Sequence, residues 1–237
     1  MLMTPVQAIL IDVEGTTTAI DFVHRTLFSI ARRELPAFVE AHFDDKRFAG
    51  EFGFVRIEAG IHFGIPAQAV TSREATAVLL RMVDEDRKVT ALQSLQGEIW
   101  RDAFSRGGLR AHVYPDVRPA FARWKARGLG LCIFSSGSVA AQRLLFGHSI
   151  EGDLTPLLDG FFDSGSGGGK RDPDAYRRIA RDLARSPEAM LFLSDTVEEL
   201  DAARAAGMAT TQLLRDGAPP PPDPRHPTAS SFDQVLA

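Results

Sequence analysis

Cysteine is nearly absent from this sequence, which has one in 237 residues. That cysteine, Cys132, excludes an internal disulfide framework. It lies inside the apolar run 129–134, so we predict a reduced residue in the hydrophobic core. Metal-ligand spacing is missing among the 6 histidines, which gives them no predicted metal role.

Long uncharged apolar runs and an N-terminal targeting pattern are also missing. The first predicted core strand begins near Ala8, which leaves no room before it for a basic region, an apolar stretch and a cleavage site. No later run is long enough to span a bilayer. Positive charge is not in excess, since the formal net charge is -4, and this argues against a nucleic acid partner. We therefore expect a cytoplasmic protein that binds neither membranes nor nucleic acid.

The remaining composition, with 44% hydrophobic and 24% charged residues, fits one globular core or one core with an inserted subdomain. After Val113, short apolar runs alternate with helical patterns. The predicted strands are 129–134, 190–193 and 210–214, and the predicted helices are 116–127, 139–146, 173–185 and 197–206. This alternation predicts an α/β fold with a doubly wound, Rossmann-like parallel sheet, whose ligand crevice lies at the carboxyl ends of the strands.

Residues 22–110 show no strand alternation. Long helical patterns cover 22–43 and 73–104, and Trp100 there, like Trp124 later, is predicted to lie in the core. We interpret 22–110 as a helical cap inserted into an α/β catalytic core of residues 1–21 and 111–237. Such a cap can close over a site and exclude water. The alternative is a helical extension that only packs.

Two carboxylates, Asp12 and Glu14, follow the first predicted strand. In an extended chain, residues i and i+2 share a face about 6.5 Å apart, so both can face one ligand. Carboxylates form aspartyl-phosphate intermediates, and Asp12 therefore suits a nucleophile. Glu14 suits proton transfer. The alternative is a solvated or helix-capping pair.

Polar residues also follow the second predicted strand. Ser135 and Ser136 precede a predicted helix, where free backbone N–H groups and the helix dipole favour an anion. Helix N-capping is the alternative.

Lys170 follows the glycine-rich segment 165–169, which fails the spacing of a nucleotide-binding P-loop because Ser164 precedes it and Arg171 follows the lysine. Instead, Lys170 would hold a phosphate and offset its repulsion from Asp12. The alternative is a lysine that is only solvated.

A third strand end carries Asp195, with Glu199 four residues later. Mg²⁺ prefers oxygen ligands and needs only one or two carboxylates plus a substrate phosphate. Helix capping by Asp195 is the alternative. Together these strand ends supply what phosphate-ester cleavage requires: a nucleophile, a cation, donors for the phosphoryl oxygens and a proton.

These segments resemble the four motifs of the haloacid dehalogenase superfamily. The matching residues are 12–17, 134–138, Lys170 and 193–195. Glutamate at position 14, where most members have aspartate, and the segments 135–149 and 194–207 are similar to the enolase-phosphatase family of methionine salvage. The resemblance covers most of the predicted core.

The resemblance implies a monomeric, magnesium-dependent enzyme. It would convert 2,3-diketo-5-methylthiopentyl-1-phosphate to the acireductone 1,2-dihydroxy-3-keto-5-methylthiopentene and phosphate. By resemblance, the Asp12 carboxylate, the Glu14 main-chain carbonyl and Asp195 bind Mg²⁺. Ser135, Ser136 and Lys170 hold the phosphate and substrate, and Asp12, Glu14 and Lys170 are catalytic.

Other activities stay open at this point. A general phosphomonoesterase of the same superfamily would act on other small phosphorylated metabolites. A halide-releasing dehalogenase needs no magnesium, so Glu14 and Asp195 argue against it. A phosphate-binding protein without turnover is the non-enzymatic alternative. Glu14 is a candidate base for the enolisation, and Phe22 is a candidate contact for the methylthio group.

Overall fold

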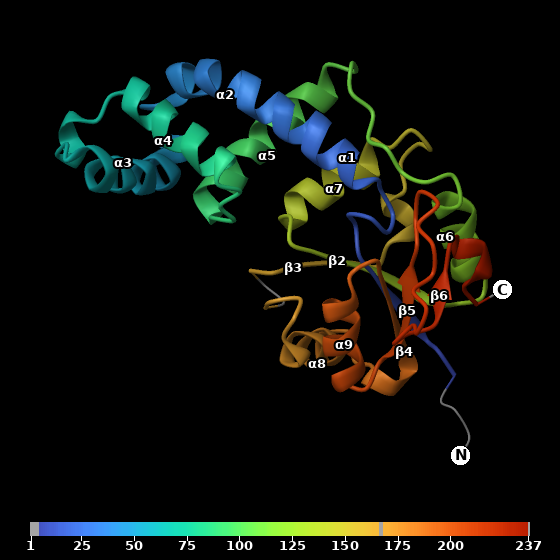
Figure 1. Ribbon diagram of the computed structural model, residues 1–237. Coiled ribbons are helices and arrows are strands. Elements are labelled where there is room, and N and C mark those ends of the chain that lie inside the picture. The colour runs from blue at the N-terminus through green and yellow to red at the C-terminus, as the bar shows by residue number, and fades with distance from the viewer. Residues whose placement is uncertain (1–4, 166–167, 237) are drawn as a thin grey trace. The chain divides into compact units, whose positions relative to one another are not determined.

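The computed structural model describes residues 5–165 and 168–236 and divides the chain into two compact units (Figure 1). Ser166 and Gly167 of the glycine-rich segment before Lys170 therefore lie outside the described residues. One unit is the continuous segment Val23–Leu109. The other joins the segment that ends at Phe22 to the segment that begins at Arg110.

The second unit is built on a parallel sheet of six strands in the order β3-β2-β1-β4-β5-β6. The strands are β1 (Ala8–Ile11), β2 (Gly130–Ser135), β3 (Gly160–Asp163), β4 (Met190–Ser194), β5 (Ala209–Leu213) and β6 (Thr228–Ala229). The strand order reverses at β1, which pairs with β2 on one side and β4 on the other. The predicted doubly wound sheet is confirmed, and in such sheets ligands bind outside the carboxyl ends of the strands at the point where the order reverses.

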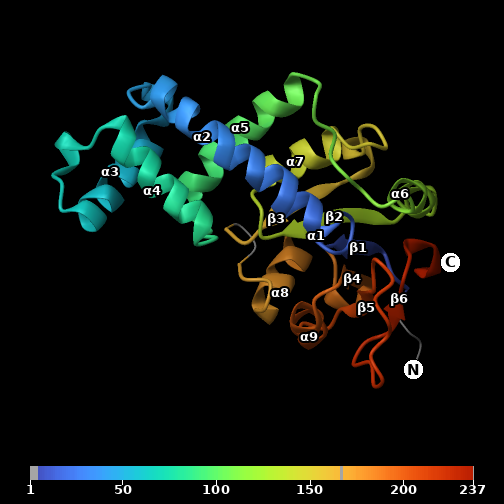
Figure 2. The same ribbon diagram turned by 45° about the horizontal axis from the view of Figure 1, so that its top comes forward.

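Helices cover both faces of this sheet. The two views agree that α8 (Pro173–Asp182) and α9 (Val197–Ala205) lie on one side, and α6 (Val117–Ala126) and α7 (Val139–Gly147) on the other (Figure 2). The face under α8 and α9 packs Leu10, Cys132 and Phe192 against the helices. Cys132 is a buried free thiol, as predicted.

The helix ends follow their local sequences. Asp172 caps α8 by accepting a hydrogen bond from the N–H of Asp174, and proline occupies the first helical position, where its missing donor costs nothing. Gly207 ends α9 in a left-handed conformation, φ 104°, that a residue with a side chain rarely adopts.

The unit Val23–Leu109 is helical, and none of its residues, all of which are described, lies in a strand. It begins with a π-helical turn, Val23–Leu27, which follows α1 (Ile20–Phe22). Its other helices are α2 (Phe28–His42), α3 (Ala49–Phe63), α4 (Ser72–Asp84) and α5 (Thr90–Ser105). The expectation of one helical pattern over 73–104 is wrong, because the chain turns after α4 at Asp86, φ 49°.

Both tryptophans are core residues, as predicted. Trp100 is 7% exposed and Trp124 is completely buried. The indole N–H of Trp100 donates to the Leu27 carbonyl at 2.8 Å, which satisfies its polar group inside the helical unit. The short 3₁₀ turns of the chain are Lys46–Phe48, Ala67–Ala69, Thr155–Leu157, Pro187–Ala189 and Phe232–Gln234. Within the described residues, no helix has the length and apolar character needed to span a membrane.

The central position of β1 makes a prediction about stability. Ile9 is 0% exposed and Ile150, in the same unit, is 54% exposed. Ile9→Ala removes buried methyl groups and leaves a cavity, so it should lower the free energy of unfolding by about 2 to 5 kcal/mol. Ile150→Ala should change it by less than about 0.5 kcal/mol. Urea unfolding followed by circular dichroism measures both, and equal effects would contradict the placement of β1 at the centre of the core.

Candidate active site

The carboxylate of Asp12 directly follows β1 and is the centre of the candidate site; Asp12 is 3% exposed. Its Oδ1 accepts hydrogen bonds from the backbone N–H of Val13 at 2.7 Å and from Nζ of Lys170 at 2.5 Å. Its Oδ2 accepts from Oγ of Ser194 at 3.3 Å. The backbone N–H of Asp12 donates to the carbonyl of Leu193 at 2.9 Å, which extends the pairing of β1 with β4. The carboxylate is therefore held in a fixed orientation, as a nucleophile requires.

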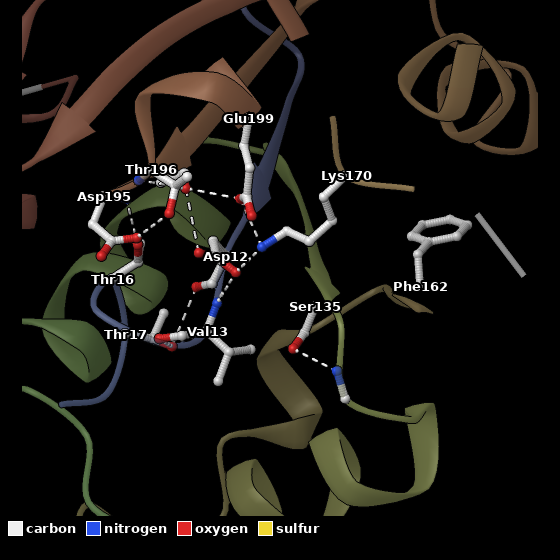
Figure 3. Close-up of polar contacts among 12 residues, drawn as sticks. Asp12, Val13, Thr16, Thr17, Ser135, Phe162, Lys170, Asp195, Thr196 and Glu199 are labelled. Atoms are coloured by element: carbon white, nitrogen blue, oxygen red, sulfur yellow. Dashed lines mark hydrogen bonds and ion pairs between the residues drawn. The ribbon is translucent and has the colours of Figure 1, made fainter. Parts of the chain in front are cut away.

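Lys170 places a buried ammonium between two carboxylates (Figure 3). Its Nζ lies 2.5 Å from Asp12 Oδ1 and 2.7 Å from Glu199 Oε2, and its side chain is 10% exposed. Burial alone lowers the pKa of a lysine, but the charges of Asp12 and Glu199 outweigh it and raise the pKa of Lys170 above its ordinary value. The hydroxyl of Tyr176 donates to the Lys170 carbonyl at 2.7 Å and fixes the backbone there. Lys170 is thus a protonated point charge beside Asp12.

Two further carboxylates, Asp195 and Glu199, follow β4. The N–H of Asp195 donates to Oγ1 of Thr16 at 3.0 Å, and its Oδ1 accepts from Oγ1 of Thr196 at 3.1 Å. Burial and the negative charge of Asp12 raise the pKa of Asp195 to about 6. The same two causes raise the pKa of Glu199 against the opposing effect of the neighbouring ammonium. Lys170 pairs with Asp12 and Glu199, and Asp195 is a third nearby carboxylate, so these carboxylates outnumber the lysine.

The loop after Asp12 fits closely against Asp195. Gly15 has φ 69°, and a Cβ at this position would collide with the Asp195 carboxylate. The carbonyl of Val13 accepts hydrogen bonds from the N–H groups of Thr16, Thr17 and Thr18 at 3.3, 2.9 and 3.0 Å, which makes the loop a tight turn. The turn thereby lies directly against the Asp195 carboxylate, whose pKa is raised by burial and by the charge of Asp12.

The donor set fits a hard cation such as Mg²⁺. Asp12 and Asp195 offer carboxylate oxygens, and the glycine at position 15 keeps a side chain out of the space between the loop and Asp195. Across residues 5–165 and 168–236, no group of three or more His, Cys, Asp or Glu side chains is arranged to hold a metal ion. A third protein ligand would therefore come from the main chain, for which the sequence proposed the Glu14 carbonyl. Glu14 is partly buried, and its backbone pairs with Thr18 in an isolated bridge.

Ser135 and Ser136 lie at the carboxyl end of β2, on the strand next to β1. Ser135 is 4% exposed, and its Oγ accepts from the N–H of Gly137 at 3.1 Å (Figure 3). The helix cap of α7 is a different residue, Ser138, whose Oγ accepts from the N–H of Ala141 at 3.3 Å. The structure thus joins Asp12, Lys170 and Asp195 in one network and places Ser135 at the end of the neighbouring strand and Ser136 directly after it, at the same edge.

The sequence did not assign several residues of this network. Glu199 was noted beside Asp195, yet its ion-pair partner is Lys170. The hydrogen-bonding roles of the Ser194 and Thr16 hydroxyls and of the Tyr176 phenol were missed. The sequence pattern could have indicated Ser194, because this polar residue ends a buried strand at the same edge of the sheet as Asp12. Tyr176 lies on the buried face of α8 among apolar residues, and nothing in that pattern distinguishes it from core.

Comparisons with known proteins identify the family. Residues 6–207 match the model of haloacid dehalogenase-like hydrolases. An enolase-phosphatase E1 from Sorangium cellulosum is 51% identical over 99% of both chains, and one from Azotobacter vinelandii is 47% identical over 98% of this chain and 97% of its own. The chain belongs to the enolase-phosphatase E1 family of haloacid dehalogenase-like hydrolases. The resemblance stated from the motifs is confirmed, and the chain is a phosphatase-type hydrolase.

The structure of this chain is similar to the crystal structure of UTR4 protein from Saccharomyces cerevisiae. It has a TM-score of 0.79, with 32% identity, 97% of this chain covered and 100% of that chain covered. Hydrolases of this superfamily and enolase-phosphatases are generally metal-dependent, which agrees with the deficit of positive charge around Asp12 and Asp195.

The close approach at Gly15 predicts a selective loss of activity. Gly15→Ala should displace Asp195 and lower phosphatase activity about a hundredfold, because small misplacements of catalytic groups have effects of this size. Gly128→Ala is the matched control: Gly128 has φ 76° with open space around its Cβ position. It should lower the free energy of unfolding by about 1 kcal/mol and leave activity unchanged. Similar activity in both variants would show that Asp195 tolerates the extra methyl group.

Proposed function

We propose that this chain converts 2,3-diketo-5-methylthiopentyl-1-phosphate to 1,2-dihydroxy-3-keto-5-methylthiopentene and phosphate, first by enolisation and then by dephosphorylation, in methionine salvage. The observation that supports this most directly is the match to proteins named enolase-phosphatase E1 over 99% of the chain, so that both compact units are included. The buried network of Asp12, Lys170 and Asp195 supplies the groups that the phosphatase step needs.

In the phosphatase step, a carboxylate oxygen of Asp12 attacks phosphorus and forms an O–P bond while the substrate's ester P–O bond breaks. The electron pair leaves with the substrate oxygen, which takes a proton from Glu14. Water then attacks the phosphoryl group of the aspartyl phosphate, returns a proton to Glu14 and restores the Asp12 carboxylate. Lys170 holds phosphoryl oxygens beside Asp12 and offsets their mutual repulsion. Ser135 and Ser136 would donate to the remaining phosphate oxygens.

Mg²⁺ is the proposed metal, held by the carboxylates of Asp12 and Asp195 and by the main-chain carbonyl of Glu14. When bound, it supplies Lewis-acid stabilisation of charge on a phosphoryl oxygen or on the oxyanion of an enolate, so one ion serves both steps. The protein's own task is to orient the carboxylates of Asp12 and Asp195. Lys170 contributes to that task for Asp12 through its ion pair.

We further propose that the unit Val23–Leu109 acts as a cap that excludes water during the reaction. Glu14 stays the candidate base for enolisation. Phe22, partly buried with its ring 6.3 Å from that of His112, stays the candidate contact for the methylthio group. The cytoplasmic location and the monomeric state expected from the sequence also stay predictions.

The proposed reaction can be tested with the synthetic diketone phosphate and Mg²⁺, following the ultraviolet absorbance of the enolised species alongside free phosphate. Enol should appear before phosphate, and both should be lost on chelation. Asp12→Asn should lower phosphate release by about ten thousandfold or more, since it removes the nucleophile. Asp223→Asn, at an exposed position, should behave as wild type. Phosphate release from many ordinary monoesters, with no preference for the diketone, would indicate a general phosphatase instead.

The raised pKa of Asp195 predicts how metal binding depends on pH. Below about 6, the metal-free site holds a proton on Asp195 that must leave before a cation binds. The apparent dissociation constant for Mg²⁺ should therefore increase as pH falls through 6, up to about tenfold per pH unit, and this contribution should vanish at higher pH. Isothermal titration calorimetry measures the constant directly. Asp195→Asn should abolish this dependence, and a wild-type affinity that is flat across the range would contradict the assignment.

A further inference from the structure

Arg215 lies beyond residues 6–207, the part of the chain that the family model matches, yet it contacts the loop after Asp12. It follows β5 at the same carboxyl edge of the sheet as the catalytic network, and it is 9% exposed. A buried arginine costs free energy unless its charge and its donors have partners. Its partners therefore indicate what the residue does.

The guanidinium of Arg215 is held from several sides. Its Nη1 donates to Oδ2 of Asp116 at 2.7 Å and to the carbonyl of Ser230 at 3.3 Å. Its carbon Cζ lies 4.4 Å from the ring centre of Tyr114 and 4.6 Å from that of Phe232, so two aromatic rings flank the cation. These contacts orient the guanidinium, and its Nη2 is buried without a hydrogen-bond partner among the described residues.

Asp116 is itself fixed. Its Oδ2 also accepts hydrogen bonds from the N–H of Phe232 at 2.6 Å and from Oγ of Ser231 at 2.9 Å. Burial alone would raise the pKa of this carboxyl, but the hydrogen bonds from Arg215 and Phe232 lower it below its ordinary value. Asp116 is therefore ionised, and it connects Arg215 to the segment near the C-terminus.

From this anchored position, Nε of Arg215 donates to the main-chain carbonyl of Thr16 at 2.9 Å. The side chain of the same threonine accepts the N–H of Asp195 at 3.0 Å. Thr16 thus receives one hydrogen bond from Arg215 and one from the backbone of a proposed metal ligand. It lies two residues after Glu14, whose main-chain carbonyl is another proposed ligand.

We propose that Arg215 is a positioning residue, which fixes the turn Val13–Thr18 against Asp195 and so makes the segment after β5 part of the support of the active site. The guanidinium does not touch the substrate in this proposal. The guanidinium acts by preventing the turn from moving away from Asp195. The proposal rests on the proposed function only for the expected effect on turnover. The order of the turn itself can be measured without any substrate.

Lysine is the informative replacement. It keeps the positive charge, but its single ammonium cannot reproduce the planar fork that reaches Thr16 and Asp116 in different directions. Arg123→Lys is the matched control: Nη2 of Arg123 donates to the carbonyl of Phe232 at 2.8 Å, and its Cζ lies 5.8 Å from the ring centre of Trp124. Arg123 therefore contacts the same C-terminal segment.

Two readouts on the 237-residue chain test the proposal. Hydrogen exchange of the metal-free protein should show faster exchange at the amides of 15–18 and at Asp195 in Arg215→Lys, and no change there in Arg123→Lys. With the diketone phosphate, Arg215→Lys should lower kcat about tenfold to a hundredfold, because it misplaces catalytic groups rather than removing them, and change KM by less than about twofold. Arg123→Lys should leave both constants unchanged.

Unchanged exchange at the turn in Arg215→Lys would overturn the proposal, as would equal effects of the two lysine variants. If the wild type does not turn over the diketone phosphate, the proposed function fails, while the exchange comparison still decides whether Arg215 orders the turn. If Arg215→Lys does not fold, Asp116→Asn replaces it. That variant keeps the shape of Asp116 but weakens the anchor of Arg215, so it should accelerate exchange at the turn in the same way, and wild-type exchange in it would count against the proposal.

Discussion

The ion pairs of one buried ammonium hold the candidate active site together. Nζ of Lys170 lies 2.5 Å from Asp12 and 2.7 Å from Glu199, so residues from the end of β1, from the loop before α8 and from α9 meet at a single charge. Burial and the negative charge of Asp12 raise the pKa values of Asp195 and Glu199, and the charge of Lys170 opposes both shifts. Lys170 therefore favours the ionised forms of Asp195 and Glu199 without fully offsetting their burial, and its exclusion from solvent strengthens its ion pairs with Asp12 and Glu199.

The sheet topology explains why distant parts of the chain reach this point. β1 lies between β2 and β4, and Ile11 is in register with Ile133 of one neighbour and Leu193 of the other. The residues that follow these three positions are therefore level with one another at the edge where the strand order reverses. Asp12 follows directly, and Ser194 follows Leu193, which is why its hydroxyl reaches the Asp12 carboxylate. The topology fixes the meeting point, and the residues at the strand ends supply its chemistry.

The sequence was sufficient to predict those parts of the fold and of the candidate site that a local residue pattern determines. Buried strands and the polar residues after them could be located, because apolar runs and abrupt polarity changes are visible without knowing the fold. The short strands β3 and β6 were missed: the four residues of β3 are only partly buried, and β6 has two residues. The partners of Glu199 and Arg215 were missed for another reason. Each lies far away in sequence, so only the folded topology brings the pairs together.

The electrostatics of the folded site also explain why its support extends beyond the residues of the chemistry. A pKa near 6 for Asp195 means that the metal-free protein holds this carboxylate at a cost, which a bound cation would remove. Repulsion between the carboxylates of Asp12 and Asp195 would favour their separation. The contacts that oppose such a separation are the hydrogen bond from Asp195 to Thr16 and the anchored guanidinium of Arg215 behind that threonine. A metal site whose carboxylates lie close together in the metal-free protein needs hydrogen bonds that hold them in place. In this chain, Arg215 in the segment after β5 provides one of these hydrogen bonds.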